Sequence, residues 1–173
     1  MITLNQTISN VINDAKRYEM RINSTGFLVT LSYRVRYLRK NGSFRYKALL
    51  PIDLLFGIIR RFVSTTIIPS SISIGPGFCM PHCDGVILNA KSIIGSNVTL
   101  FQQVTLGGWH EGAPTILDNT SIYAGAKVIG GVTVGRNCKI GANVVITSDI
   151  PDNSSVSTEK PILRTRSEKE KND

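Results

Sequence analysis

Residues 116–150 read ILDNTSIYAGAKVIGGVTVGRNCKIGANVVITSDI, and an apolar residue returns there at every sixth position. A period of six is neither the helical period of about 3.6 nor the alternation of a strand. The stretch therefore predicts a solenoid of hexapeptide repeats, which is a parallel β-helix. The positions on this phase are Ile116, Ile122, Val128, Val134, Ile140 and Ile146. Four positions after each of them comes a small or branched residue, namely Thr120, Ala126, Val132, Cys138, Val144 and Ile150.

The preceding stretch, residues 68–106, keeps the six-residue period with one change of phase. Two residues are inserted near Asp84 and Gly85, and a longer insertion, Gly107–Ala113, holds the only Trp of the chain. Because loops that interrupt a regular scaffold often carry function, this longer insertion is a candidate site. The apolar positions are Ile68, Ile74 and Met80, followed by Leu88, Ile94, Leu100 and Leu106.

Residues 1–66 lack the six-residue period, and we expect an N-terminal α-helical segment there. Asn41-Gly42 is a typical helix stop within it. Residues 67–157 are the predicted β-helix, so the fold class is mainly β. Residues 158–173 form a tail whose end, from Thr165, has no apolar residue and is expected to be disordered. The helical runs are Thr3–Arg21, Phe27–Lys40 and Ala48–Val63.

The net charge of the chain limits the classes of partner that it can have. There are 20 Lys and Arg against 12 Asp and Glu among 173 residues, a formal net charge of +8 at pH 7. Such an excess fits a nucleic-acid binder, a membrane-surface protein or an enzyme for anionic ligands. The sequence has no helix-turn-helix, zinc-finger or aromatic RNA-binding signature, so we expect no nucleic-acid partner.

Three cysteines, an odd count, indicate a reducing compartment rather than a disulfide framework, and we expect a cytoplasmic protein. Cys138 falls at an inward position of the repeat and is expected in the core. Cys79, His82 and Cys83 lie close enough in sequence to suggest a metal site. Their spacing fits no zinc pattern and a fourth ligand is missing, so we expect no metal.

Much of the positive charge lies between Arg34 and Arg61, and two interpretations stay open. In one, the helices only cover the open edge of the first coil. In the other, they also contact an anionic membrane surface peripherally, with the basic side chains toward the headgroups. Pro51, Asp53 and Gly57 interrupt the third helical run too early for a membrane span. The basic residues are Arg34, Arg36, Arg39, Lys40, Arg45, Lys47, Arg60 and Arg61.

Several short motifs occur together and in order along residues 68–164. They make the chain resemble the hexapeptide acyltransferases of the left-handed β-helix class. Within that class it is similar to the serine acetyltransferases and to their relatives that acetylate sugars of bacterial surface polysaccharides. The left hand comes from the resemblance alone, because parallel crossovers are nearly always right-handed. The motifs are Ile74-Gly75-Pro76-Gly77, His82, Gly85-Val86-Ile87-Leu88-Asn89, Ile94-Gly95, Gln102–Gly108 and Gly141-Ala142-Asn143.

The resemblance implies that His82 is the catalytic general base of an acetyl transfer. Histidine suits this role because its unperturbed pKa lies closest to neutrality, so it can take a proton from an alcohol and return it to a thiolate. The serine enzymes orient their histidine with an aspartate about one coil earlier, but Ile67 stands at that position here. Asp84 or a backbone carbonyl could orient His82 instead, and the choice stays open.

The resemblance also implies acetyl-CoA as co-substrate. Small residues let a pantetheine arm approach the backbone closely, and cations suit its phosphates. An N–H group near Gly108 would stabilise the oxyanion that forms during transfer. The implied positions are Gly108, Ala124, Gly125 and Ala142 along the pantetheine, with Lys139, Lys160 or Arg164 near the phosphates.

The sequence of the loop after residue 107 differs from that of the serine acetyltransferases. They have an Arg-His-Pro-Lys-Ile segment whose first two residues suit an amino-acid carboxylate, whereas this chain reads Gly-Ala-Pro-Thr-Ile at residues 112–116. The expected acceptor is therefore a sugar hydroxyl of a bacterial surface polysaccharide or its precursor, on a lipid carrier or free. The candidate acceptor contacts are Trp109, as an aromatic platform, His110, Glu111 and Asp84.

Three hypotheses follow from these observations. The leading one is an acetyl-CoA-dependent O-acetyltransferase acting on a sugar of a polysaccharide. The alternatives are a serine O-acetyltransferase of cysteine biosynthesis and a non-catalytic hexapeptide scaffold. A homotrimer with active sites between subunits is expected from the resemblance and from the flat sides of a triangular prism.

Overall fold

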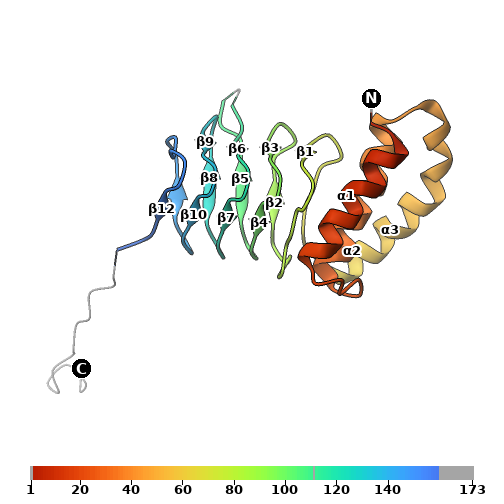
Figure 1. The fold of residues 1–173 in the computed structure, drawn as a ribbon, viewed down its shortest axis with the longest axis horizontal. Coiled ribbons are helices and arrows are strands. Elements are labelled where there is room, and N and C mark those ends of the chain that lie inside the picture. The colour runs from red at the N-terminus through yellow and green to blue at the C-terminus, as the bar shows by residue number, and fades with distance from the viewer. Residues whose placement is uncertain (1, 111, 160–173) are drawn as a thin grey trace, which may run out of the picture.

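The computed structural model describes residues 2–110 and 112–159, which form a helical segment followed by a three-sided parallel β-helix (Figure 1). In Figure 1 the helices lie together at one end of the column of coils. The prediction of a mainly β fold with N-terminal helices is confirmed. The expected disordered end of the tail lies outside the described residues. The helices are α1 (Leu4–Arg17), α2 (Thr25–Asn41), the 3-10 helix η1 (Phe44–Leu49) and α3 (Leu50–Val63).

The strands form three four-stranded parallel sheets, one for each side of the prism. Consecutive strands fall in different sheets, so the chain winds around a central core, as the six-residue period predicts. The first sheet contains β1 (Ser73–Ile74), β3 (Ile93–Ile94), β6 (Thr115–Ile116) and β9 (Thr133–Val134). The second contains β4 (Thr99–Leu100), β7 (Ser121–Ile122), β10 (Lys139–Ile140) and β12 (Ser155–Val156). The third contains β2 (Ile87–Leu88), β5 (Thr105–Gly107), β8 (Lys127–Ile129) and β11 (Val145–Ile146).

The pairing register gives the length of each coil. Thr115 pairs with Thr133, and the difference of 18 residues equals three hexads. Ser73 pairs with Ile93, a difference of 20, which accounts for the two inserted residues. Ile93 pairs with Thr115, a difference of 22, which accounts for the 107–113 loop. The insertions therefore bulge out at corners and leave the stacking of the strands intact.

The last coil is shorter than the sequence pattern suggests. Lys139 pairs with Ser155, a difference of 16, and Val134 pairs with Ile150, also a difference of 16. Ile150 thus follows Val134 in the first sheet and takes a position of the main apolar phase. Its assignment to the second, smaller position of the repeat is wrong, because two residues are missing from this coil.

Apolar side chains on the six-residue phase fill the inside of the prism. All positions of this phase from Ile68 to Ile146 are buried, and so are Thr120, Ala126, Val132, Cys138 and Val144. Burying each large aliphatic side chain stabilises the fold by about 1.5–3 kcal/mol. Since the core leaves no room for other groups, chemistry has to take place on the outer edges and loops.

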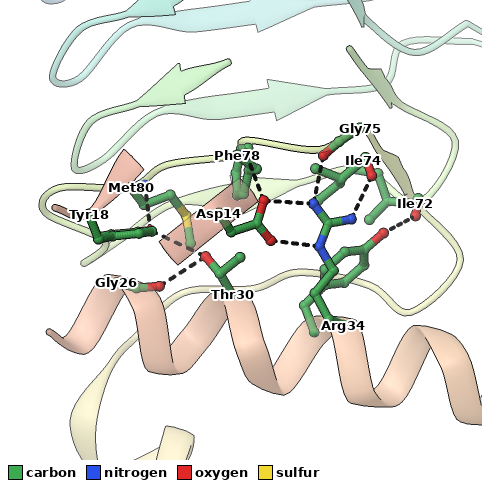
Figure 2. Close-up of polar contacts among 11 residues, drawn as sticks. Asp14, Tyr18, Gly26, Thr30, Arg34, Ile72, Ile74, Gly75, Phe78 and Met80 are labelled. Atoms are coloured by element: carbon green, nitrogen blue, oxygen red, sulfur yellow. Dashed lines mark hydrogen bonds and ion pairs between the residues drawn. The ribbon is translucent and has the colours of Figure 1, made fainter. Parts of the chain in front are cut away.

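The helices close the first coil through one buried ion pair (Figure 2). Arg34 of α2 donates from Nε to Oδ2 of Asp14 on α1 at 2.8 Å, and from Nη1 to the carbonyl of Ile74 at 2.7 Å. Asp14 Oδ1 also accepts from the N–H of Phe78 at 2.9 Å. Burial raises the pKa of Asp14, whereas the Arg34 guanidinium acts in the opposite direction. Two helices and two segments of the first coil therefore meet at a single pair of charges.

Two further contacts bring α1 and α2 against the first coil. The N–H of Met80 donates to the Tyr18 hydroxyl at 2.7 Å, and Tyr33 donates to the carbonyl of Ile72 at 2.8 Å. Gly26 lies on the carbonyl of Met80, where a Cβ atom would clash. The helices thus form a packed cover over the first coil, as in the first of the two interpretations of this segment.

Three of the eight basic residues of this segment form ion pairs within the helical cover. Arg34 is buried, and Arg36 and Arg39 donate to the two carboxylate oxygens of Asp53 on α3 at 3.0 and 2.8 Å. Although burial opposes it, these two guanidinium groups hold the pKa of Asp53 below its usual value. The assignment of Arg34 to a membrane-facing surface is therefore wrong. Arg36 and Arg39 are partly buried in their pairs with Asp53, which gives no support for a membrane-facing role. Within residues 2–110 and 112–159, no helix combines the length and apolarity needed to cross a bilayer.

The first helix also ends earlier than expected. It stops at Arg17 instead of continuing to Arg21, and the following Glu19 and Met20 both have left-handed φ angles, 53° and 58°. Successive left-handed residues cannot continue a right-handed helix. The segment after α1 is consequently a tight turn that lies next to the first coil.

We expect Arg34→Met to lower the free energy of unfolding by about 3–5 kcal/mol, because it leaves the Asp14 carboxylate buried without its partner. Urea denaturation at pH 7 measures this loss. Arg36→Met is the matched control and should cost much less, since Arg39 still binds Asp53. Equal losses in the two variants would show that the Asp14–Arg34 pair has no special role in holding the helices.

Candidate active site

The strand register stacks small and polar residues along one edge of the prism. Thr99 pairs with Ser121 and Ser121 pairs with Lys139, so the residues three positions later, Gln102, Ala124 and Ala142, form a column. The N–H of Gly125 donates to the carbonyl of Gln102 at 3.0 Å, and the N–H of Asn143 donates to that of Ala124 at 2.9 Å.

His82 lies at the corresponding corner of the first coil, because Cys79 pairs with Thr99. The two extra residues of this coil widen the corner between Met80 and Gly85. We call the corner of His82 together with the column of Gln102, Ala124 and Ala142 the His82 edge. It runs from the helical end of the molecule toward the last coils.

The His82 side chain is exposed and makes no hydrogen bond with any described residue. Asp84 is also exposed, and its backbone carbonyl accepts from the N–H of Gln103 at 2.9 Å. Its carboxylate likewise has no hydrogen-bond partner within the described part of the chain. Asp84 therefore behaves as a turn residue, and the group that orients His82 stays open.

Gln102 is a residue to which the sequence analysis assigned no role. Its Oε1 atom is buried, and no hydrogen-bond partner for it is found among residues 2–110 and 112–159. A buried polar atom without a partner calls for an explanation, and a ligand N–H group or a water molecule would supply one. No local signal marked Gln102 in the sequence. In the structure Asp84 lies one coil before it, because the N–H of Gln103 donates to the carbonyl of Asp84 and Gly85 lies against Gln103.

The predicted cofactor residues Ala124, Gly125 and Ala142 lie together along the His82 edge. Gly125 is required there, since its φ is +72° and a Cβ atom would clash with Asn143. Lys139 is exposed on β10, three residues before Ala142, while Lys160 and Arg164 lie outside the described residues. The edge thus offers a strip of small side chains with a cation near its far end.

The predicted loop residues lie on a different edge. Gly108 follows the end of β5 in the third sheet, and a Cβ atom there would meet the Asn89 side chain at 2.7 Å. Trp109 is 61% exposed and its ring stacks on His110, with centroids 5.5 Å apart. Glu111 is outside the described residues. One chain therefore does not bring Gly108, Trp109 and His110 together with His82.

The cysteines near His82 are part of the packing. Cys79 and Cys83 are buried free thiols, and burial raises the pKa of Cys79, which keeps that thiol neutral. Within the described residues, no three His, Cys, Asp or Glu side chains are grouped so that they could hold a metal ion. That the protein needs no metal stays a prediction of the sequence.

The repeat region matches a known family model, and several curated proteins match a larger part of the chain. Residues 113–148 match the model of the bacterial transferase hexapeptide (six repeats). The chain is 44% identical over 102 residues to serine acetyltransferase of Bacillus pumilus, covering 57% of this chain and 47% of that protein. It is 30% identical over 163 residues to serine acetyltransferase of Helicobacter pylori, covering 90% of this chain and 92% of that protein. The chain thus spans about half the length of the first of these relatives and nearly all of the second.

Similar folds occur among crystal structures of the same group. Serine acetyltransferase isoform 3 of Entamoeba histolytica, in complex with cysteine, superposes with a TM-score of 0.74 at 30% identity over 95% of this chain and 61% of that one. The enzyme of Neisseria gonorrhoeae, in complex with serine, gives 0.71 at 25% identity over 91% and 69%. A serine acetyltransferase complex with CoA gives 0.70 at 26% identity over 88% and 67%. In each case the likeness includes the helices as well as the solenoid, because it covers most of this chain.

Proposed function

Because this chain belongs to the serine acetyltransferase family of hexapeptide-repeat transferases, we propose that it transfers the acetyl group of acetyl-CoA to the hydroxyl of serine. The observation that carries the proposal is the nearly end-to-end match to the Helicobacter pylori enzyme. The neighbouring structures with bound serine and bound CoA support the two substrates.

The prediction of a saccharide acceptor is wrong. It rested on the absence of an Arg-His pair from the 107–113 loop and on Trp109 as a sugar platform. The curated relatives are serine acetyltransferases, and one structural neighbour holds serine itself, which favours the alternative function. Nothing in the comparisons supports polysaccharide biosynthesis or a lipid-linked acceptor. Loss of one pair of polar residues therefore does not identify a change of acceptor.

In this proposal His82 is the general base. Its imidazole takes the proton of the serine hydroxyl as the oxygen attacks the thioester carbonyl, and the tetrahedral oxyanion then collapses and expels the CoA thiolate. The proton on His82 passes to that thiolate, so the histidine returns neutral. The exposure of His82 at the widened corner supports access by both substrates.

The His82 edge supports an extended site for acetyl-CoA. Ala124 is partly exposed and Ala142 is exposed along this edge, whereas Gly125 is buried beneath Asn143. Lys139 supplies a positive charge for a phosphate. Gln102, at the same corner in the next coil, has a buried amide oxygen without a partner among the described residues, and a rotation of its side chain would present that oxygen to a pantetheine N–H group. Gly108 stays our candidate for an oxyanion N–H donor, supplied from another edge.

The separation of the two edges supports active sites between subunits. His82 lies on one edge of the prism and the loop of Gly108, Trp109 and His110 on another, so one copy offers each half of a site to a different neighbour. A threefold arrangement of prisms closes such a set of contacts without leftover edges. A homotrimer remains a proposal on this basis, and a cytoplasmic location remains a proposal that rests on the odd number of cysteines.

The proposed reaction predicts CoA release when the protein is given acetyl-CoA and L-serine. We expect kcat/KM near the common range of ~10⁴ M⁻¹s⁻¹ or above. The same assay is run with a panel of nucleotide sugars and short oligosaccharides as alternative acceptors. The free thiol of released CoA is measured in each case. Faster turnover with any sugar than with serine would contradict the proposed acceptor.

We predict that His82→Ala leaves the fold intact and lowers kcat by ~10²–10⁴-fold, the usual contribution of a general base. His110→Ala changes the other half of the proposed site and should lower the rate much less, because His110 is not the group that takes the serine proton. Steady-state kinetics with serine and acetyl-CoA measure both variants, with circular dichroism as a check of folding. A His82→Ala enzyme of near-normal turnover would show that another group is the base.

For the oligomer, light scattering at working concentration should give about three times the mass of one chain, because a closed threefold assembly completes the sites. A stable monomer with full activity would exclude sites shared between subunits.

A further inference from the structure

A zwitterionic acceptor poses a physical problem for this chain, and the inference that follows rests on the proposed function. Serine carries a carboxylate and an ammonium group, and an unpaired charge in a closed site is costly. Ala113 and Pro114 in the 107–113 loop offer no side-chain hydrogen bond. The loop of Trp109 and His110 also lies on another edge of the prism than His82, so within one chain any counter-charge beside His82 belongs to a different segment.

A pocket beside His82 contains such charges. It has a volume of about 370 Å3 and lies between the end of α1 and the widened corner of the first coil. Pro81 and His82 line it from the coil, and Arg17, Glu19 and Arg21 line it from the helical side. A cation and an anion thus share one pocket with the proposed base.

The turn that carries these charges is held firmly against the solenoid. Arg17 donates from Nη2 to the hydroxyl of Thr99 at 2.7 Å, and the Tyr18 hydroxyl accepts from the N–H of Met80 at 2.7 Å. The N–H of Met20 donates back to the carbonyl of Ala15 at 2.9 Å. These contacts hold the left-handed turn at Glu19 and Met20 in place, so the backbone from which the charged side chains extend has a defined position relative to His82.

Arg21 and Glu19 remain available to a ligand. Their side chains are 74% and 78% exposed, and they meet through a single contact of 3.2 Å between Arg21 Nη2 and Glu19 Oε2. A guanidinium has five N–H donors in a fork that matches a carboxylate, so most of its donors are still free to bind one. Glu19 in turn keeps acceptor capacity for an ammonium group.

We propose that this pocket is the acceptor subsite, in which Arg21 binds the carboxylate and Glu19 the ammonium of the amino acid, so that its hydroxyl faces His82. Arg17 is a positioning residue that anchors the turn through Thr99 and adds positive charge beside the carboxylate. The small-residue strip of the His82 edge runs from His82 toward the last coils, whereas the pocket lies on the helical side of His82. Donor and acceptor thus approach the base from opposite directions.

The test compares three hydroxy compounds that differ by one charge each: L-serine, ethanolamine, which lacks the carboxylate, and 3-hydroxypropanoate, which lacks the ammonium. We expect Arg21→Ala to raise KM for serine by about 10- to 100-fold, the usual effect of losing a charge-assisted hydrogen bond, with kcat nearly unchanged. The same variant should treat ethanolamine as the wild type does. Glu19→Gln should raise KM for serine and for ethanolamine, which carry the ammonium group, and leave KM for 3-hydroxypropanoate unchanged.

Arg61→Ala is the matched control, because Arg61 is an exposed arginine on α3 outside this pocket and its loss should change no KM. If the wild type acetylates serine and both pocket variants keep its KM and its ranking of the three compounds, the assignment of the subsite is wrong while the proposed function stands. If the wild type acetylates none of the three compounds, the proposed function is wrong and the subsite falls with it.

Discussion

The narrow inside of the prism is the constraint on which the rest of the structure depends. Each side of a coil buries one apolar side chain of the main phase and a second side chain near the corner, and together these fill the inside of the prism from Ile68 to Ile146. Dense packing of this kind tolerates little change of volume. Functional groups therefore have to lie outside the core, and the proposed base, the small-residue column and the 107–113 loop all lie at corners or in loops.

The ion pair of Asp14 and Arg34 links this scaffold to the helices. It is buried and reaches the backbone of the first coil at Ile74 and Phe78, so it sets how α1 and α2 rest on the prism (Figure 2). A buried pair adds little net stability compared with apolar packing, but it specifies one arrangement of the groups that it joins. In this protein the arrangement brings the turn after α1 to His82. Of the eight basic residues that in the sequence resembled a membrane-binding segment, Arg34 has this internal use and Arg36 and Arg39 pair with Asp53, whereas Lys40, Arg45, Lys47 and Arg61 are exposed.

The sequence predicted the solenoid well because a six-residue period has a single structural meaning, and the insertions at residues 84–85 and 107–113 appeared as breaks of phase. The shortened last coil escaped notice, since Ile150 fits both positions of the repeat. The turn at Glu19 and Met20 was extended into a helix because neither residue is glycine, the usual sign of a left-handed backbone. The partners of Arg34 and the pocket at His82 depend on contacts between distant segments, and no local pattern reveals them. The boundaries at residues 66 and 157 stay predictions.

The register of the coils determines the distances between residues along the His82 edge. Neighbouring parallel strands lie about 4.8 Å apart, so Gln102, Ala124 and Ala142 follow one another in the column at fixed steps of about that size. In a solenoid each repeat contacts only its neighbours, and whole repeats can be gained or lost without disturbing the others. Adding a coil beyond Gln102 would lengthen the edge by one step and leave His82 and the helical cover in place. The length of an elongated ligand site along this edge can therefore change only in steps of one coil. The same holds for the distance between the end near His82 and the charged end near Lys139.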